Sequence, residues 1–349
     1  MTVREHLGEA ATSIIAVLAG ILVGALILWL TGCSPLRAYG ALLEGAFGDY
    51  YAVIDTLTAM MPIMFAGAAA ALMFRAALFF IGMEGQLYIG AVTSFLAGYL
   101  LHLPAELHVV IAFIAGGLGG LLWGLLPGYL RAKYGVNETV MSIMMNWIAI
   151  FLTDYIVQYA FADPTASIAR TYKIHATALI PKISSSLPLS WGFVVAVVFT
   201  VLTGFLLYNT SWGFEIRAVG LNPRAARVAR ISVESTYLKV FLISGFLAGL
   251  AGASMVLGVF GSIVHRFSPG YGWDGITAAL IARNNPYMVI PASLLLATLR
   301  TGSIGMMLGA GVSNEMVLAI QGVILVAAAA PEAYSLLARY IKRIRGGTR

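Results

Sequence analysis

Long apolar runs constrain this chain more than any other feature of its sequence. Val53–Phe74 and Val109–Leu130 carry almost no charge, and each is about as long as the roughly 20 residues with which a helix crosses a bilayer. Charged residues make up only 10% of the 349 residues, whereas a soluble domain has about 25%, so polar groups cannot cover the surface. The sequence therefore predicts an all-α, polytopic membrane protein.

About ten apolar segments follow one another along the chain. They are Ala11–Leu30, Val53–Phe74, Ala76–Leu101, Val109–Leu130, Thr139–Tyr159, Trp191–Tyr208, Val240–Val264, Ile276–Ile281, Met288–Leu299 and Met316–Ala330. Ile276–Ile281 and Met288–Leu299 are unusually short for spans, and Pro35–Tyr51 is expected to lie at the membrane interface. Residues 1–349 are therefore expected to form a single transmembrane domain with about ten helices.

A charged island, Trp212–Ile231, interrupts this apolar pattern. Its arginines are Arg217, Arg224, Arg227 and Arg230. Asn222 is suited to cap a helix, and Pro223 fits the first helical position, where its missing N–H has no cost. The pattern predicts a short amphipathic helix from Pro223 to about Arg230 at a membrane surface. A basic loop that only fixes the topology is the alternative interpretation.

The distribution of basic residues predicts the orientation. With a cytoplasmic N-terminus, most of the 21 lysine and arginine residues lie inside, including Arg4, the island and the tail from Arg339. The positive-inside rule favours this arrangement, and shifting the chain by one crossing would place the island outside. Both termini are therefore expected in the cytoplasm, and the net charge of +6 does not indicate nucleic-acid binding.

The cysteine and histidine content gives no sign of a metal site. The single cysteine, Cys33, excludes an intrachain disulfide and a cysteine-based metal cluster, and the five histidines lack metal-ligand spacing. Leu30–Cys33 matches a lipoprotein-processing signature. However, the preceding run Ala11–Leu30 is long for a signal peptide, and a protein with many spans needs no lipid anchor.

Two glycine-interrupted segments are candidates for a substrate pathway. Ile81–Gln86 contains Glu84 between two glycines, and a broken helix at membrane depth is tolerated where it lines a cavity. Pro269–Gly275 is similar, with Trp273 and Asp274 near its tip. The alternatives are that Glu84 only begins a span and that Pro269–Gly275 is an external turn. Asn137 and Asn146 are explained by helix capping and interhelical hydrogen bonding.

The chain has no phosphate-binding loop of the G-x-x-x-x-G-K-[ST] kind. If transport depends on ATP, a partner must therefore supply the nucleotide site.

Several motifs together resemble one transporter family. FFIGMEGQLYIGA (Phe79–Ala91) resembles the FNIGxEGQ signature of permease subunits in bacterial ABC importers of the nucleoside and simple-sugar class. Gly213–Val233 looks like the cytoplasmic coupling segment of these permeases, and Tyr134–Asn146 and Gly270–Pro286 fit in the same order. The chain departs from the family at Phe80, where Asn is usual, and at Arg230, where Gly is usual. GMEGQ points to the nucleoside-type branch.

The resemblance implies a type II permease fold, similar to that of cobalamin importers, with a coupling segment at about residues 209–236. It implies ATPase subunits that carry ATP and Mg, a second and different permease subunit, an extracellular or periplasmic binding protein, and no cofactor in this chain. The implied setting is the lipid of the bacterial inner membrane. The residues expected on the substrate pathway are Glu84, Gln86, Asn146, Trp273 and Asp274. Those expected to couple to the ATPase are Arg217, Gly220, Asn222, Pro223, Arg224, Ala225 and Arg227.

Two other classes of protein would account for part of this sequence. An ATP-independent secondary transporter or channel for a small polar solute would explain the broken helices but not the charged island. An intramembrane aspartyl protease would need both Asp154 and Asp274, but the residues around them differ from the protease motifs. The sequence therefore predicts a transport subunit and not an enzyme.

Overall fold

The computed structural model describes residues 18–184 and 189–329. Within these ranges the secondary structure is helical, and extended pairing is limited to isolated bridges such as Ala162–Thr171. The all-α prediction is confirmed for this part of the chain. The expectations for Arg4, the start of the first apolar segment and the basic tail from Arg339 concern residues outside it.

The helices follow the apolar segments closely. They are Leu18–Leu30, α2 (Pro35–Phe47), α3 (Tyr50–Arg75), α4 (Met83–Leu100), α5 (Ala105–Tyr134), α6 (Glu138–Tyr155) with the π-helical turn η1 (Ile156–Ala160), the 3₁₀ turn η2 (Ala176–Ala178), α7 (Gly192–Asn209), α8 (Ser211–Leu221), α9 (Pro223–Val228), α10 (Val233–Met255) with the π-helical turn η3 (Val256–Phe260), α11 (Tyr271–Ile281), α12 (Pro286–Ala310) and α13 (Asn314–Ala329).

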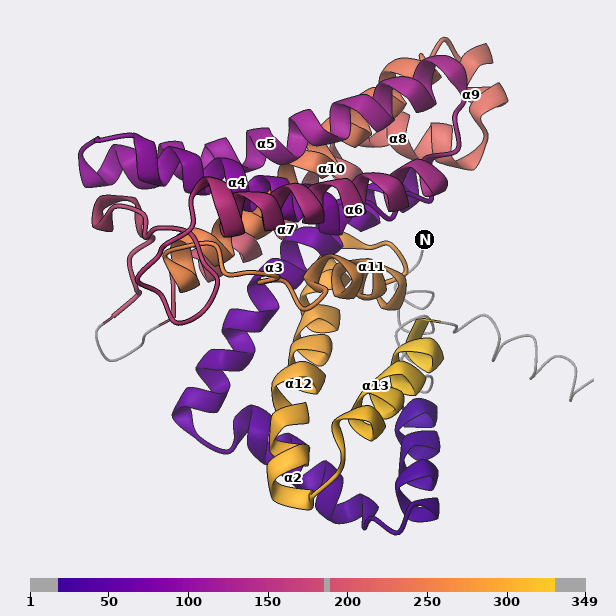
Figure 1. Ribbon diagram of the computed structural model, residues 1–349. Coiled ribbons are helices and arrows are strands. Elements are labelled where there is room, and N and C mark those ends of the chain that lie inside the picture. Colours follow the sequence, from indigo (N-terminus) through magenta and orange to yellow (C-terminus); the bar gives the residue numbers. More distant parts are fainter. Residues whose placement is uncertain (1–17, 185–188, 330–349) are drawn as a thin grey trace, which may run out of the picture. The chain divides into compact units, whose positions relative to one another are not determined.

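The chain divides into two compact units, and the boundaries fall within α3 and α12 (Figure 1). One unit contains the chain up to Thr56 and from Thr298 onward. In it, Leu28, Met306 and Ile320 form part of an apolar core. Gly45 of α2 lies so close to Gly305 of α12 that a Cβ would come within 2.8 Å of the Gly305 Cα. Small residues therefore let these two helices approach closely.

The other unit, Leu57–Ala297, is built around α4, α5 and α10, which pack against one another (Figure 1). Glycines permit this packing. A Cβ on Gly90 of α4 would overlap the backbone of Gly249 in α10, and one on Gly120 of α5 would overlap the Gly245 carbonyl oxygen. The three helices touch backbone to backbone, as is common where small residues line helix contacts in membranes.

Six helices in the described part of the chain are long and apolar enough to cross a membrane. They are Tyr50–Arg75, Ala105–Tyr134, Glu138–Ala160, Gly192–Asn209, Val233–Phe260 and Pro286–Ala310. The prediction of a short segment ending at Leu299 is wrong, because α12 continues through Arg300 to Ala310. A single charged side chain does not end a helix, since the backbone hydrogen bonds continue past it. The stretch assigned to the interface contains helix α2.

The third apolar region is not helical from its start. Residues 76–82 are irregular, Ala77 has a positive φ of 55°, and α4 begins only at Met83. The region is interrupted, but earlier than predicted: Glu84, Gly85 and Gln86 are helical, and Glu84 lies in the first turn of α4, as the alternative interpretation expected.

Candidate functional site

A row of polar side chains on α6 satisfies the irregular backbone that precedes α4. We call this row the polar stripe. It consists of Glu138, Thr139, Ser142 and Asn146. Glu138 Oε1 accepts a hydrogen bond from the Phe79 N–H at 3.2 Å, and Thr139 Oγ1 donates to the Phe79 carbonyl at 2.7 Å. The Ile81 N–H donates to Ser142 Oγ at 3.3 Å. Irregular backbone inside a membrane protein needs such partners.

Asn146 lies at the end of the polar stripe, where its side chain joins the irregular residues 76–82 to the first turn of α4. Its Nδ2 donates to the Ile81 carbonyl at 2.9 Å, and its Oδ1 accepts from the Gly85 N–H at 2.8 Å. Asn146 is only 3% exposed. The predicted interhelical hydrogen bonding is confirmed, and its specific role is to hold the start of α4 beside the middle of α6.

Glu84 connects this break to the second glycine-interrupted segment. Its Oε2 accepts a hydrogen bond from the Gly272 N–H in the first turn of α11 at 2.7 Å. Glu84 is only 3% exposed, so this hydrogen bond is largely shielded from solvent. Gly272 lies against the backbone of Glu84, because a Cβ there would come within 2.6 Å of the Glu84 Cα. The two segments singled out in the sequence therefore meet.

A cavity of about 220 Å³ opens where they meet, and we call it the central pocket. It is lined by Glu84, Tyr88, Ile143, Asn146, Trp147, Ile150, Arg266, Ser268, Gly270 and Trp273. Three of the five predicted pathway residues, Glu84, Asn146 and Trp273, are brought together. The other two do not line it: Gln86 is fully buried beside Gly124 of α5, and Asp274 lies in the first turn of α11.

Arg266 lines the central pocket but was missed in the sequence. Asp154, near the end of α6, holds it: Asp154 Oδ2 lies 3.5 Å from Arg266 Nε, and Oδ1 lies 3.1 Å from His265 Nδ1. Arg266 has a positive φ of 50°, which is unusual for a residue other than glycine. The only sequence signal was its position shortly before Pro269–Gly275.

The charged island forms two helices, α8 and α9, rather than one. Asn222 caps α9, because its side chain accepts from the N–H groups of Arg224 at 3.0 Å and Ala225 at 3.1 Å. The predicted cap and the position of Pro223 are confirmed. The helix was expected to reach about Arg230 but ends at Val228. Arg230 has a left-handed φ of 62°, which is incompatible with continuing a right-handed helix.

The predicted apolar side of this helix is smaller than expected. Ala226 is 3% exposed and packs with Val219 and Val233, whereas Val228 is 87% exposed. Ala225 is also exposed. A helix as short as α9 buries little of its surface, so its position depends on Ala226 and on the cap at Asn222.

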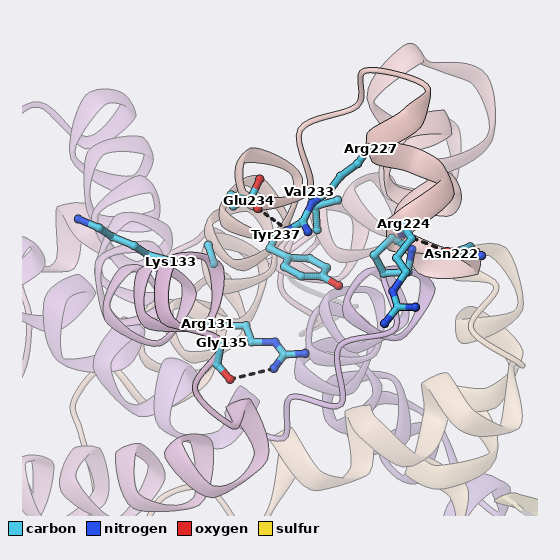
Figure 2. Close-up of a pocket in the computed structure, with 11 residues that line it drawn as sticks. Arg131, Lys133, Gly135, Asn222, Arg224, Arg227, Val233, Glu234 and Tyr237 are labelled. Carbon is cyan, nitrogen blue, oxygen red and sulfur yellow. Dashed lines mark hydrogen bonds and ion pairs between the residues drawn. The ribbon is translucent and has the colours of Figure 1, made fainter.

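A second and larger cavity, of about 700 Å³, lies beside α9, and we call its lining the coupling surface (Figure 2). It is lined by Arg131, Ala132, Lys133, Gly135, Asn222, Pro223, Arg224, Arg227, Val233, Glu234 and Tyr237. Arg227 pairs with Glu234 at 2.6 Å, and Arg131 pairs with Glu138 at 3.3 Å. The lining contains four cations, from α5 and α9, and one carboxylate, Glu234, so the surface is basic.

Three predicted coupling residues, Arg217, Gly220 and Ala225, lie outside the coupling surface. The Arg217 guanidinium is over the Tyr208 ring, with its Cζ 5.6 Å from the ring centroid. Gly220 packs against Arg75, where a Cβ would overlap the Arg75 carbonyl oxygen. The sequence did not suggest Arg131 and Lys133 as members of this surface, because they end a different helix, α5.

Comparison with known proteins identifies the family. The family model described as "Branched-chain amino acid transport system / permease component" matches residues 52–329. The guanosine ABC transporter permease protein NupP of Bacillus subtilis is 37% identical over 319 residues, which cover 90% of this chain and 91% of the relative. The glucose ABC transporter permease protein TsgB13 of Haloferax volcanii is 30% identical over 346 residues, covering 96% and 89%.

A third relative is the nucleoside ABC transporter permease protein NupB of Lactococcus lactis. It is 31% identical over 303 residues, which cover 84% of this chain and 83% of the relative. The matches span most of each chain, and the interrupted membrane helices agree with a transport function. The chain therefore belongs to the permease-component family of branched-chain amino acid transport systems, and it is a multi-pass membrane permease subunit of an ABC importer, not an enzyme.

Proposed function

We propose that this permease carries a nucleoside or a related simple sugar across the bacterial plasma membrane. The observation that carries the proposal is the central pocket, where the indole rings of Trp147 and Trp273 accompany the polar groups of Glu84 and Asn146. Trp147 and Trp273 are 51% and 45% exposed, so neither side chain is enclosed by the rest of this chain. Aromatic faces stack on nucleobases, and buried amide and carboxylate groups bond to polar ring substituents. Two relatives are named for guanosine or nucleosides.

The position of the central pocket agrees with a transport pathway. Its α6 residues, Ile143 to Ile150, lie about midway along the Glu138–Ala160 helix, and transporters bind substrate near the bilayer midplane between broken helices. The volume of about 220 Å³ is smaller than the roughly 300–1,000 Å³ of complete ligand pockets. We infer that this chain supplies one wall of the pathway and that a second, different permease subunit supplies the other.

The family and the coupling surface support a proposal for the wider assembly. The chain is proposed to have about ten spans in a type II permease fold, with both termini in the cytoplasm and residues 1–349 acting as one transport domain. ATPase subunits carrying ATP and Mg would dock on α9 and the coupling surface. A binding protein would deliver the substrate from outside. ATP binding would close the ATPases, displace α8 and α9, and switch access to the pocket.

Purification in mild detergent and reconstitution test this proposal. The tagged chain is expected to bring along an ABC ATPase, a second permease and a binding protein, identified by mass spectrometry. Vesicles containing the complex should then take up radiolabelled guanosine only with ATP, and a hydrolysis-deficient ATPase is the control. Solute uptake by the chain alone, without ATP, would favour a secondary transporter or channel. Uptake of glucose but not guanosine would contradict the nucleoside assignment.

A further inference from the structure

Arg75, the last residue of α3, holds the chain just beyond the C-terminal end of α11. Its Nε donates to the Asn284 carbonyl at 2.8 Å, and its Nη2 donates to the Arg283 carbonyl at 3.1 Å. Arg283 and Asn284 have positive φ values of 51° and 57°, which turn the chain sharply between α11 and α12. A guanidinium with two hydrogen bonds to adjacent carbonyls fixes their position more closely than a single contact does.

The same residue also contacts the coupling segment through its main chain. Gly220 of α8 lies against the Arg75 carbonyl oxygen so closely that no side chain fits between them. The Arg75 and Arg217 guanidiniums both lie over the Tyr208 ring, with Cζ 6.0 Å and 5.6 Å from its centroid. The end of α8 passes directly into α9 through Asn222. Arg75 therefore lies between the coupling segment and α11.

The helix α11 connects this point to the central pocket. It has 11 residues, so it spans about 16 Å. At its N-terminal end, the Gly272 N–H is held by Glu84, and Trp273 lines the pocket. Along its length it packs tightly, because a Cβ on Gly275 would overlap Ala66 of α3. The short helix α11 is therefore held by contacts near both of its ends.

We propose that Arg75 is a positioning residue that transmits displacement of α8 and α9 to α11, and thereby to the Trp273 side of the central pocket. The inference rests on the proposed function, because it needs an ATPase acting on α9. The proposed route through α3 and α11 differs from a route through α7 and α10, which flank α8 and α9 in the chain.

Arg75→Gln tests this inference in the reconstituted complex. The substitution removes the charge and the paired hydrogen bonds. We expect normal assembly and normal ATP hydrolysis, but at least about fivefold fewer solute molecules transported per ATP, in line with typical coupling energies. Arg75→Lys keeps the charge but not the paired N–H donors of the guanidinium. The number of solute molecules that it transports per ATP should therefore be intermediate. Lys173→Gln, at an exposed lysine in the loop between η1 and α7, is the control and should match the unmodified complex.

A second readout follows α11 directly. Thr277 lies on α11, and Thr277→Cys in a Cys33→Ser background gives this chain one thiol, whose labelling rate is measured on the isolated subunit band with and without ATP. The rate should change with ATP in the unmodified complex and stay constant in Arg75→Gln. If Arg75→Gln does not assemble, Arg75→Lys is judged by the same two measurements. An unchanged transport ratio together with ATP-dependent labelling overturns the inference.

The failure of the proposed function would be seen separately. An unmodified complex without ATP-dependent uptake contradicts the proposed function before any variant is measured. An unmodified complex that couples normally, with an Arg75→Gln complex that does the same, contradicts only the role of Arg75.

Discussion

The central pocket is stabilised by buried hydrogen bonds between distant segments, whereas the coupling surface is stabilised mainly by exposed local contacts. At the central pocket, side chains that are 3% exposed, Glu84 and Asn146, satisfy the backbone of other segments. At the coupling surface, α9 is held by its own cap, by the single buried side chain of Ala226 and by the Arg227–Glu234 pair, whose side chains are 61% and 52% exposed. Losing the partner of a buried donor costs about 1–3 kcal/mol, whereas an exposed ion pair contributes about 0–1 kcal/mol.

The difference indicates what each region can tolerate. Changes at the central pocket disturb the path of the backbone, so they should affect uptake and stability together. Changes at the coupling surface leave the fold intact and should affect the contact with the ATPase. The following substitutions test this distinction, in order of decreasing expected effect.

Glu84→Ala should have the largest effect. It leaves the buried Gly272 N–H without its acceptor and frees the start of α11. Uptake by the reconstituted complex is expected to fall roughly 10- to 100-fold, and the melting temperature of the complex should fall with it. Glu84→Gln retains an acceptor oxygen and should be less impaired. Full uptake in Glu84→Ala would remove this carboxylate from the pathway.

Gly220→Leu should separate hydrolysis from transport. A side chain at this position overlaps the Arg75 carbonyl oxygen, so α8 must shift, at a cost of about 1–3 kcal/mol. We expect uptake to fall about tenfold while the ATPase still binds and hydrolyses ATP. Gly40→Leu is the matched control, because open space surrounds a Cβ at Gly40 in α2. Equal uptake in the two variants would contradict the tight contact at Gly220.

Local chemistry made part of this molecule predictable from sequence. The Asn222–Pro223 dipeptide identified the start of α9 because a cap and a first-turn proline act within a few residues. The glycines around Glu84 indicated an interruption near this point, although the irregular residues 76–82 precede Glu84, which lies in the first turn of α4. Both features are fixed by neighbours in the chain, so no knowledge of the fold was needed to find them.

Contacts between distant segments were not predictable in the same way. Glu138, Ser142 and Asn146 recur every four residues, which places them on one face of α6. This periodicity was visible, but its purpose depends on Phe79–Gly85 lying beside that face, which is a tertiary contact. The burial of Gln86 has the same origin, because only the packing of α4 against Gly124 of α5 turns its side chain away from the central pocket.

Asn222→Ala should weaken the coupling surface without changing the fold. Losing an N-cap costs about 1 kcal/mol, so α9 should fray and the ATPase should bind about fivefold more weakly. The affinity is measured by titrating the purified ATPase onto the permease in detergent. Asn222→Asp keeps a capping oxygen and should restore binding. If the melting temperature of Asn222→Ala falls as far as that of Glu84→Ala, the contacts of the coupling surface contribute as much stability as those of the central pocket, and the comparison fails.

Asp274→Ala should have the smallest effect and sharpens the comparison between two neighbouring carboxylates. Asp274 lies in the first turn of α11, as does Gly272, whose N–H donates to Glu84. Unlike Glu84, Asp274 is partly exposed and does not line the central pocket. An acidic residue in a first helical turn contributes about 0.3–1 kcal/mol, so uptake should fall only about twofold. Uptake kinetics of the reconstituted variant measure this. A loss as large as that of Glu84→Ala would mean that Asp274 contacts substrate, and that burial does not distinguish the two carboxylates.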